Sequence, residues 1–89
     1  MKATKIKMKS GCRESSNLCE IDAIYLEEMG MFYKKEAIYD YLLAYPKSIC
    51  VNIYPYPALQ PVISPLGEKY VRSKPDSTQQ DNLLNLPRC

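Results

Sequence analysis

Four cysteines and a pair of adjacent glutamates are the residues of this chain whose types are suited to covalent or acid–base chemistry. No histidine accompanies them, so the commonest general base is absent, and a Ser–His or Cys–His triad cannot form within one chain. Glu27 and Glu28 are neighbours at the end of a predicted strand, where consecutive side chains point apart. Cys12 has Arg13 beside it but no base to lower the pKa of its thiol. We therefore expect no catalytic residue and no enzymatic activity.

The spacing of the cysteines also disfavours a metal centre. Structural zinc sites normally contain two close C-x-x-C pairs, whereas Cys12, Cys19, Cys50 and Cys89 are scattered along the chain. A disulfide framework requires an oxidising compartment, and the N-terminal segment lacks the apolar core of a secretory signal. We expect free thiols in a cytoplasmic protein, with no bound metal and no cofactor.

The most motif-like part of the chain surrounds Arg72. A guanidinium presents a planar fork of donors, so Arg72 could bind an anion in a site flanked by Tyr70, Lys74 and Asn82. Alternatively, Arg72 holds the C-terminal segment in place through Asp81 or through backbone carbonyls of that segment. We favour the second interpretation, because a docked segment needs an anchor.

Two other surfaces are candidates for binding. Lys5, Lys7 and Lys9 alternate with apolar residues, and such a stripe can follow a nucleic-acid backbone. The net charge of only +2 favours instead a solvated strand face whose lysines protect a sheet edge. Tyr54 and Tyr56 lie among prolines, which indicates either an exposed contact for a partner protein or, in our preferred interpretation, packing on the local strand.

The elements that position these residues follow from the hydrophobic periodicity. Alternation of polar and apolar residues predicts strands over 4–9, 18–27, 48–54, 59–63 and 68–73. A spacing of three and four residues predicts one helix over 34–45, which Pro46 ends. We expect this helix to bury Ile38, Tyr41, Leu42 and Tyr45 and to leave Lys34, Lys35, Glu36 and Asp40 on the solvent side.

The composition indicates a single globular domain over residues 1–89. Hydrophobic residues make up 46% and charged residues 25%, and the apolar runs are too short to span a membrane. Segment 74–89 is rich in turn-forming residues, and its Leu83, Leu84 and Leu86 are expected to dock on the core. We predict an α+β domain of order β-β-α-β-β-β, with one helix packed on an antiparallel or mixed sheet.

One motif links the last predicted strand to the C-terminal segment. It consists of Tyr70-Val71-Arg72-Ser73, followed by Asp81-Asn82-Leu83 and Leu86-Pro87. The motif resembles the C-terminal part of a family of small, uncharacterised, mostly bacterial proteins, a domain of unknown function. This resemblance implies one small domain and supplies no reaction, cofactor or partner.

Together these features favour a binding or interaction module. We expect contact with a partner protein or homo-oligomerisation, through an exposed sheet edge or through the surface of Tyr54 and Tyr56. Nucleic-acid binding through the lysine stripe and Arg72 is the less favoured alternative, and no membrane partner is expected.

Overall fold

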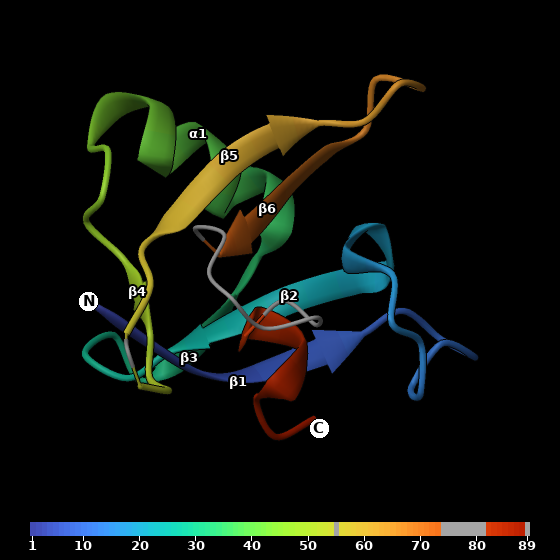
Figure 1. Ribbon diagram of the computed structural model, residues 1–89, viewed down its shortest axis with the longest axis horizontal. Helices are drawn as coiled ribbons and strands as arrows, with labels where there is room; N and C mark the ends of the chain where they lie inside the picture. The colour runs from blue at the N-terminus through green and yellow to red at the C-terminus, as the bar shows by residue number, and fades with distance from the viewer. Residues whose placement is uncertain (55, 74–81, 89) are drawn as a thin grey trace.

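The computed structural model describes residues 1–54, 56–73 and 82–88, which form one helix and six strands in two sheets (Figure 1). The strands are β1 (Lys2–Met8), β2 (Ile21–Leu26), β3 (Met31–Lys34), β4 (Cys50–Val51), β5 (Leu59–Ile63) and β6 (Lys69–Ser73), and the helix is α1 (Lys35–Ala44). Two short 3-10 helices, η1 (Leu18–Glu20) and η2 (Asn82–Asn85), complete the described elements. The predicted α+β class is confirmed.

The larger sheet is mixed, which is one of the two predicted arrangements. Its strand order is β3-β2-β1-β4, in which β1 pairs antiparallel with β2 and parallel with β4. The strands β5 and β6 form a second, antiparallel sheet, whereas the sequence predicted one sheet. Pro61 in β5 lacks a backbone N–H, which suits the expected edge position of this strand. A hydrogen bond of 2.8 Å from Leu59 N to Ile49 O links the two sheets.

A β-bulge sets which residues of β1 enter the core. Ala3 lies opposite Leu26 and Lys5 opposite Tyr25, so Thr4 is an extra residue in the ladder. The bulge changes the phase of the alternation, and Ala3 therefore joins Ile6 and Met8 on the buried face. Simple alternation from residue 4 onward predicted Ile6 and Met8 on this face but did not predict Ala3.

The strand predictions differ from the structure most at β3 and β4. The strand β3 was not predicted, because the sequence pattern has no alternating segment between Gly30 and the predicted helix. The strand predicted over 48–54 is reduced to β4, since the chain turns at Ile53, where Tyr56 N donates to Ile53 O at 2.7 Å. Its predicted buried face is confirmed at Ile49 and Val51, both of which are fully buried.

The buried face of α1 is rotated from the predicted one. It consists of Lys35, Ile38, Tyr39 and Leu42. The prediction was wrong for Lys35, which is 1% exposed, and for Tyr41 and Tyr45, which are 39% and 59% exposed. The helix contacts β5 and β6 as well as β2 and β3, so the face that meets both sheets is the one that becomes buried (Figure 1).

The C-terminal leucines dock on the core, as expected. Leu83, Leu84 and Leu86 are all buried, and they belong to the same hydrophobic cluster as the sheet residues. Ile6 N donates to Pro87 O at 2.9 Å, so this segment runs beside the second half of β1 (Figure 1). No helix among these described elements is long and apolar enough to cross a lipid bilayer.

Candidate interaction surface

An apolar groove lies where the β2–β3 hairpin meets α1. Its volume is about 350 Å³, within the range of small binding pockets. The hairpin and the helix supply most of its walls: Leu26, Met29, Tyr33, Ala37, Ile38 and Tyr41. None of the side chains that line it carries a charge. The groove therefore offers apolar surface, with tyrosine hydroxyls as its polar groups.

Large hydrophobic side chains surround the groove and remain in contact with solvent. Met29 is 53% exposed, Met31 52% and Tyr41 39%. The ring of Tyr45, which is 59% exposed, lies 4.9 Å from that of Tyr41. Methionine side chains are flexible and adapt to irregular partners, and exposed apolar patches of this kind mark interaction sites. We call the groove and these exposed side chains the groove surface.

The strand β3 forms the edge of the larger sheet beside the groove. Phe32 lies opposite Tyr25, and their rings meet edge to face with centroids 5.2 Å apart. Because side chains alternate along a strand, Met31 and Tyr33 point to the other face, which is the groove face. Among the described strands none pairs with the outer side of β3, so its outward backbone groups are available to an added strand.

Sequence reasoning missed the groove surface. It assigned Tyr41 to the core and interpreted the segment from Met29 to Met31 only as the end of the preceding strand. The available signal was the presence of two methionines on either side of Gly30, where a solvated turn would normally carry polar residues.

The aromatic pair predicted at Tyr54 and Tyr56 is exposed. Tyr54 is 82% exposed and Tyr56 56%, and their rings meet edge to face with centroids 6.0 Å apart. The two rings thus contact each other and stand out from the local strand, contrary to the preferred packing interpretation. The φ of Tyr56 is +60°, a left-handed conformation that is strained for a bulky residue. A partner contact at this pair stays a prediction.

The predicted anion site around Arg72 is described only in part. Tyr70 and Arg72 occupy alternate positions of β6, and both are half-buried. Arg72 Nε is buried and has no hydrogen-bond partner within the described part of the chain. Lys74 and Asp81 lie outside the described residues, as does the side chain of Asn82. Neither the anion site nor the anchor through Asp81 is therefore tested.

A different arginine holds the C-terminal segment. Arg88 Nη1 donates to the carbonyl oxygens of Arg13 and Ser15, each at 2.8 Å, and Nη2 donates to Leu84 O at 2.9 Å. These bonds tie the segment to the loop that follows β1. Sequence reasoning missed Arg88, since an arginine that binds backbone carbonyls needs no partner of defined spacing.

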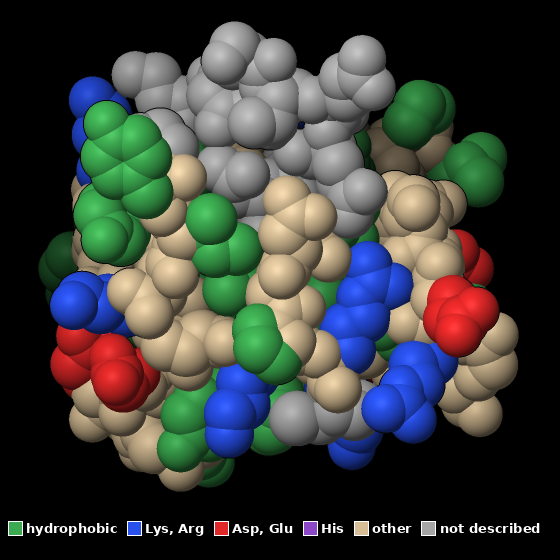
Figure 2. All heavy atoms as spheres, turned by 60° about the horizontal axis from the view of Figure 1, so that its bottom comes forward, with side chains coloured by type: hydrophobic (Ala, Val, Ile, Leu, Met, Phe, Trp, Pro, Cys, Tyr) green, Lys and Arg blue, Asp and Glu red, His purple; other side chains and the backbone are tan. Residues whose placement is uncertain are grey.

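The three lysines of the stripe make different contacts. Lys5 Nζ lies 4.9 Å from the centroid of the Tyr25 ring, whereas Lys9 Nζ forms an ion pair with Glu68 at 2.9 Å. Lys7 is exposed. On the face drawn in Figure 2, Lys and Arg side chains are divided among several groups with hydrophobic side chains between them. Nucleic-acid binding at this stripe stays a prediction.

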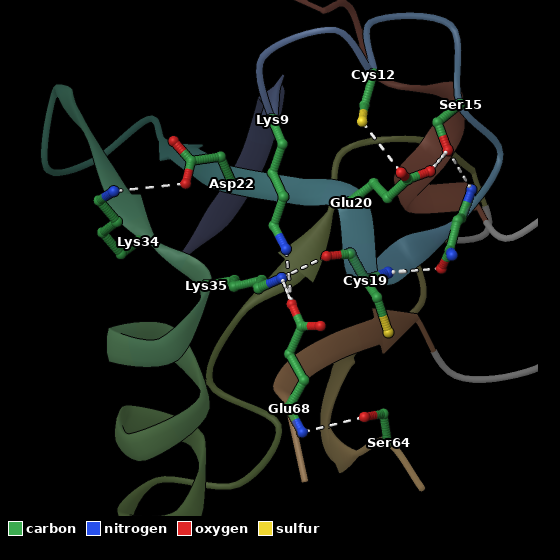
Figure 3. Close-up of polar contacts among 11 residues, drawn as sticks. Lys9, Cys12, Ser15, Cys19, Glu20, Asp22, Lys34, Lys35, Ser64 and Glu68 are labelled. Atoms are coloured by element: carbon green, nitrogen blue, oxygen red, sulfur yellow. Dashed lines mark hydrogen bonds and ion pairs between the residues drawn. The ribbon is translucent and has the colours of Figure 1, made fainter. Parts of the chain in front are cut away.

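A polar cluster is built around the buried Lys35. Its Nζ donates to the backbone oxygen of Cys19 and to Glu68 Oε2, and Lys9 Nζ donates to the same carboxylate oxygen (Figure 3). The bonds from Lys35 and then Lys9 hold the pKa of Glu68 below its usual range, and Glu68 in turn raises the pKa of Lys9. The cluster joins η1, α1 and the residue before β6, which indicates a role in stability.

A second polar cluster involves Cys12. Its Sγ donates to Glu20 Oε2 at 3.0 Å, while Ser15 Oγ donates to Oε1 (Figure 3). The hydrogen bond to Glu20 raises the pKa of the Cys12 thiol, which disfavours the reactive thiolate. Cys19 and Cys50 are also free thiols, and Cys89 lies outside the described residues. No group of three or more acidic or cysteine side chains within the described ranges is placed to hold a metal ion.

Comparison with known proteins places the chain in a family. No curated protein and no solved structure gives a significant match. The family model described as "Protein of unknown function (DUF3892)" matches residues 32–87, a range that contains α1, β4, β5, β6 and η2 together with the helical wall of the groove. The expected bacterial distribution and the C-terminal motif stay predictions. The chain belongs to the DUF3892 family, a domain of unknown function.

Proposed function

We propose that this protein is an interaction module that binds an apolar segment of a partner protein at the groove surface. The observation that supports this proposal is a groove of about 350 Å³ that is lined by uncharged side chains and bordered by half-exposed methionines. An inserted apolar side chain gains about 25 cal/mol for each Å² removed from water. Burial of a few aliphatic or aromatic side chains therefore contributes favourably to binding, against the entropy lost on association.

The edge position of β3 indicates the form of the partner segment. An extended segment can add to the outer side of β3 through backbone hydrogen bonds, and every second side chain then points to the groove face. In this arrangement the backbone pairing supplies affinity and the groove selects an apolar side chain.

Binding rather than catalysis is part of this proposal, as is a cytoplasmic location. The absence of histidine and the raised pKa of the Cys12 thiol support a role without covalent chemistry. Nucleic-acid binding through Lys5 and Lys7 is the alternative. The ion pair of Lys9 with Glu68 weakens it, because this pair removes one of the three cations from the stripe.

Selection from a displayed library of random peptides tests the proposal. We expect selected peptides to be rich in aliphatic and aromatic residues, and to lose binding when Ala37→Trp fills the groove from an exposed helix position. Ser16→Trp, which adds the same side chain on an exposed loop, should leave binding unchanged. The proposal fails if no peptide is enriched, or if the enriched peptides bind the Ala37→Trp variant equally well.

A further inference from the structure

We propose that the partner at the groove surface is a second copy of this chain, which pairs its β3 antiparallel with the β3 of the first copy. This inference rests on the proposed function, because it assigns an occupant to the same surface. A two-fold axis perpendicular to the sheet relates the two copies. The order β4-β1-β2-β3 of one copy then continues into β3-β2-β1-β4 of the other, and the two mixed sheets become one.

Under this symmetry, the side chains of β3 in one copy are complementary to those of β3 in the second copy. A perpendicular two-fold axis keeps each side chain on its own face of the sheet. When the axis passes between the two Phe32 residues, these rings lie opposite each other on the outer face, where Phe32 already meets Tyr25. On the groove face, Met31 lies opposite Tyr33 of the second copy, which is a favourable sulfur–aromatic pair.

The charges along this edge favour the antiparallel arrangement. Glu27 and Glu28 lie in the turn before β3, and Lys34 is its last residue. Antiparallel pairing centred on Phe32 places Lys34 opposite Gly30 of the second copy, beside the acidic turn. Parallel pairing would instead bring like charges together at both ends. The two-fold symmetry creates the contact between lysine and acidic turn twice.

The groups required for this contact are accessible. The side chain of Lys34 is 70% exposed, and its bond to Asp22 is long, at 3.4 Å. Glu28 is engaged, since its Oε1 accepts the backbone N–H of Lys2 at 2.8 Å. Glu27 is exposed, and its carboxylate makes no hydrogen bond or ion pair with the residues that the structure describes. Glu27 and Lys34 are therefore the pair to change.

Exchange of these two charges tests the dimer, with sedimentation velocity as the measurement. We expect the wild-type protein to be a dimer whose dissociation constant increases at least about tenfold with either Glu27→Lys or Lys34→Glu, since each variant places like charges together twice. The double variant should restore association, because it recreates both opposite-charge contacts. Lys7→Glu makes the same charge change on β1, two strands away from the edge, and should have no effect.

The outcomes separate this inference from the proposed function. A wild-type protein that is monomeric at every concentration overturns self-pairing, and so does a dimer that neither single charge change weakens. In both cases peptide binding that Ala37→Trp abolishes would still support the groove as a protein-binding site. A third outcome is that no peptide binds at the groove while the charge variants behave as expected. The groove surface would then bind only a second copy of this chain.

Discussion

Lys35 is a charged side chain that the fold accepts in its core by giving its ammonium group specific acceptors. The Cys19 carbonyl and the Glu68 carboxylate both accept from its Nζ, so the charge is compensated at a position with 1% exposure. The two ends of this ion pair differ, because the side chain of Glu68 is 35% exposed and also accepts from Lys9. Loss of the Lys35 charge and loss of the Glu68 charge should therefore lower the free energy of unfolding by different amounts.

We predict that Glu68→Gln destabilises the protein more than Lys35→Met. The first change leaves a buried ammonium group without its counter-charge and should cost about 3 kcal/mol, at the lower end for a broken buried pair because water reaches this carboxylate. The second change removes the buried charge itself, leaves Glu68 with Lys9, and should alter stability by less than about 1 kcal/mol. Urea unfolding of both variants measures the difference. Equal losses would contradict the prediction, because they would mean that removing the buried ammonium group costs as much as removing its counter-charge.

At the scale of the elements, the sequence predicts what depends on local pattern and misses what depends on distant contacts. The buried positions Ile6, Met8, Ile49 and Val51 follow from alternation, and the end of α1 follows from Pro46. The burial of Lys35 in place of Tyr41 was not predictable, because polarity alone assigns a lysine to solvent. Its acceptors are Cys19, on η1, and Glu68, the residue before β6. The groove was missed for the same reason, since its walls come from a hairpin and a helix whose relative position only the tertiary structure determines.

The element η2 contributes to the core through its leucines and exposes Asn85. Leu83 is 0% exposed, whereas Asn85 is exposed. We predict that Leu83→Ala lowers the free energy of unfolding by about 2–5 kcal/mol, the usual cost of truncating a buried leucine. Asn85→Ala, in the same short helix, should have an effect below about 0.5 kcal/mol. Thermal melting of the two variants checks this, and equal melting temperatures would show that η2 does not stabilise the rest of the domain.

At the scale of the whole molecule, three carboxylates connect segments through hydrogen bonds that require the ionised form. The bond from Lys35 holds the pKa of Glu68 below its ordinary value. The hydrogen bond from the backbone N–H of Lys2 likewise lowers the pKa of Glu28, and the hydrogen bond from the Ser15 hydroxyl lowers the pKa of Glu20. A carboxylate whose pKa is lower in the folded state stabilises the fold fully above its unfolded pKa. This contribution is lost as the pH falls through the pKa of the carboxylate in the folded state.

We therefore predict that the free energy of unfolding falls as the pH decreases below about 4.5, the ordinary pKa of these glutamates. Urea unfolding at a series of pH values measures this decrease. The Glu68→Gln variant is the matched control, because it lacks one of the three titrating groups and should show a weaker pH dependence. At neutral pH it should be the less stable protein, and the two proteins should converge as acid protonates Glu68 in the wild type. Parallel curves would contradict the prediction, since they would mean that protonation of Glu68 does not break its bonds to Lys35 and Lys9.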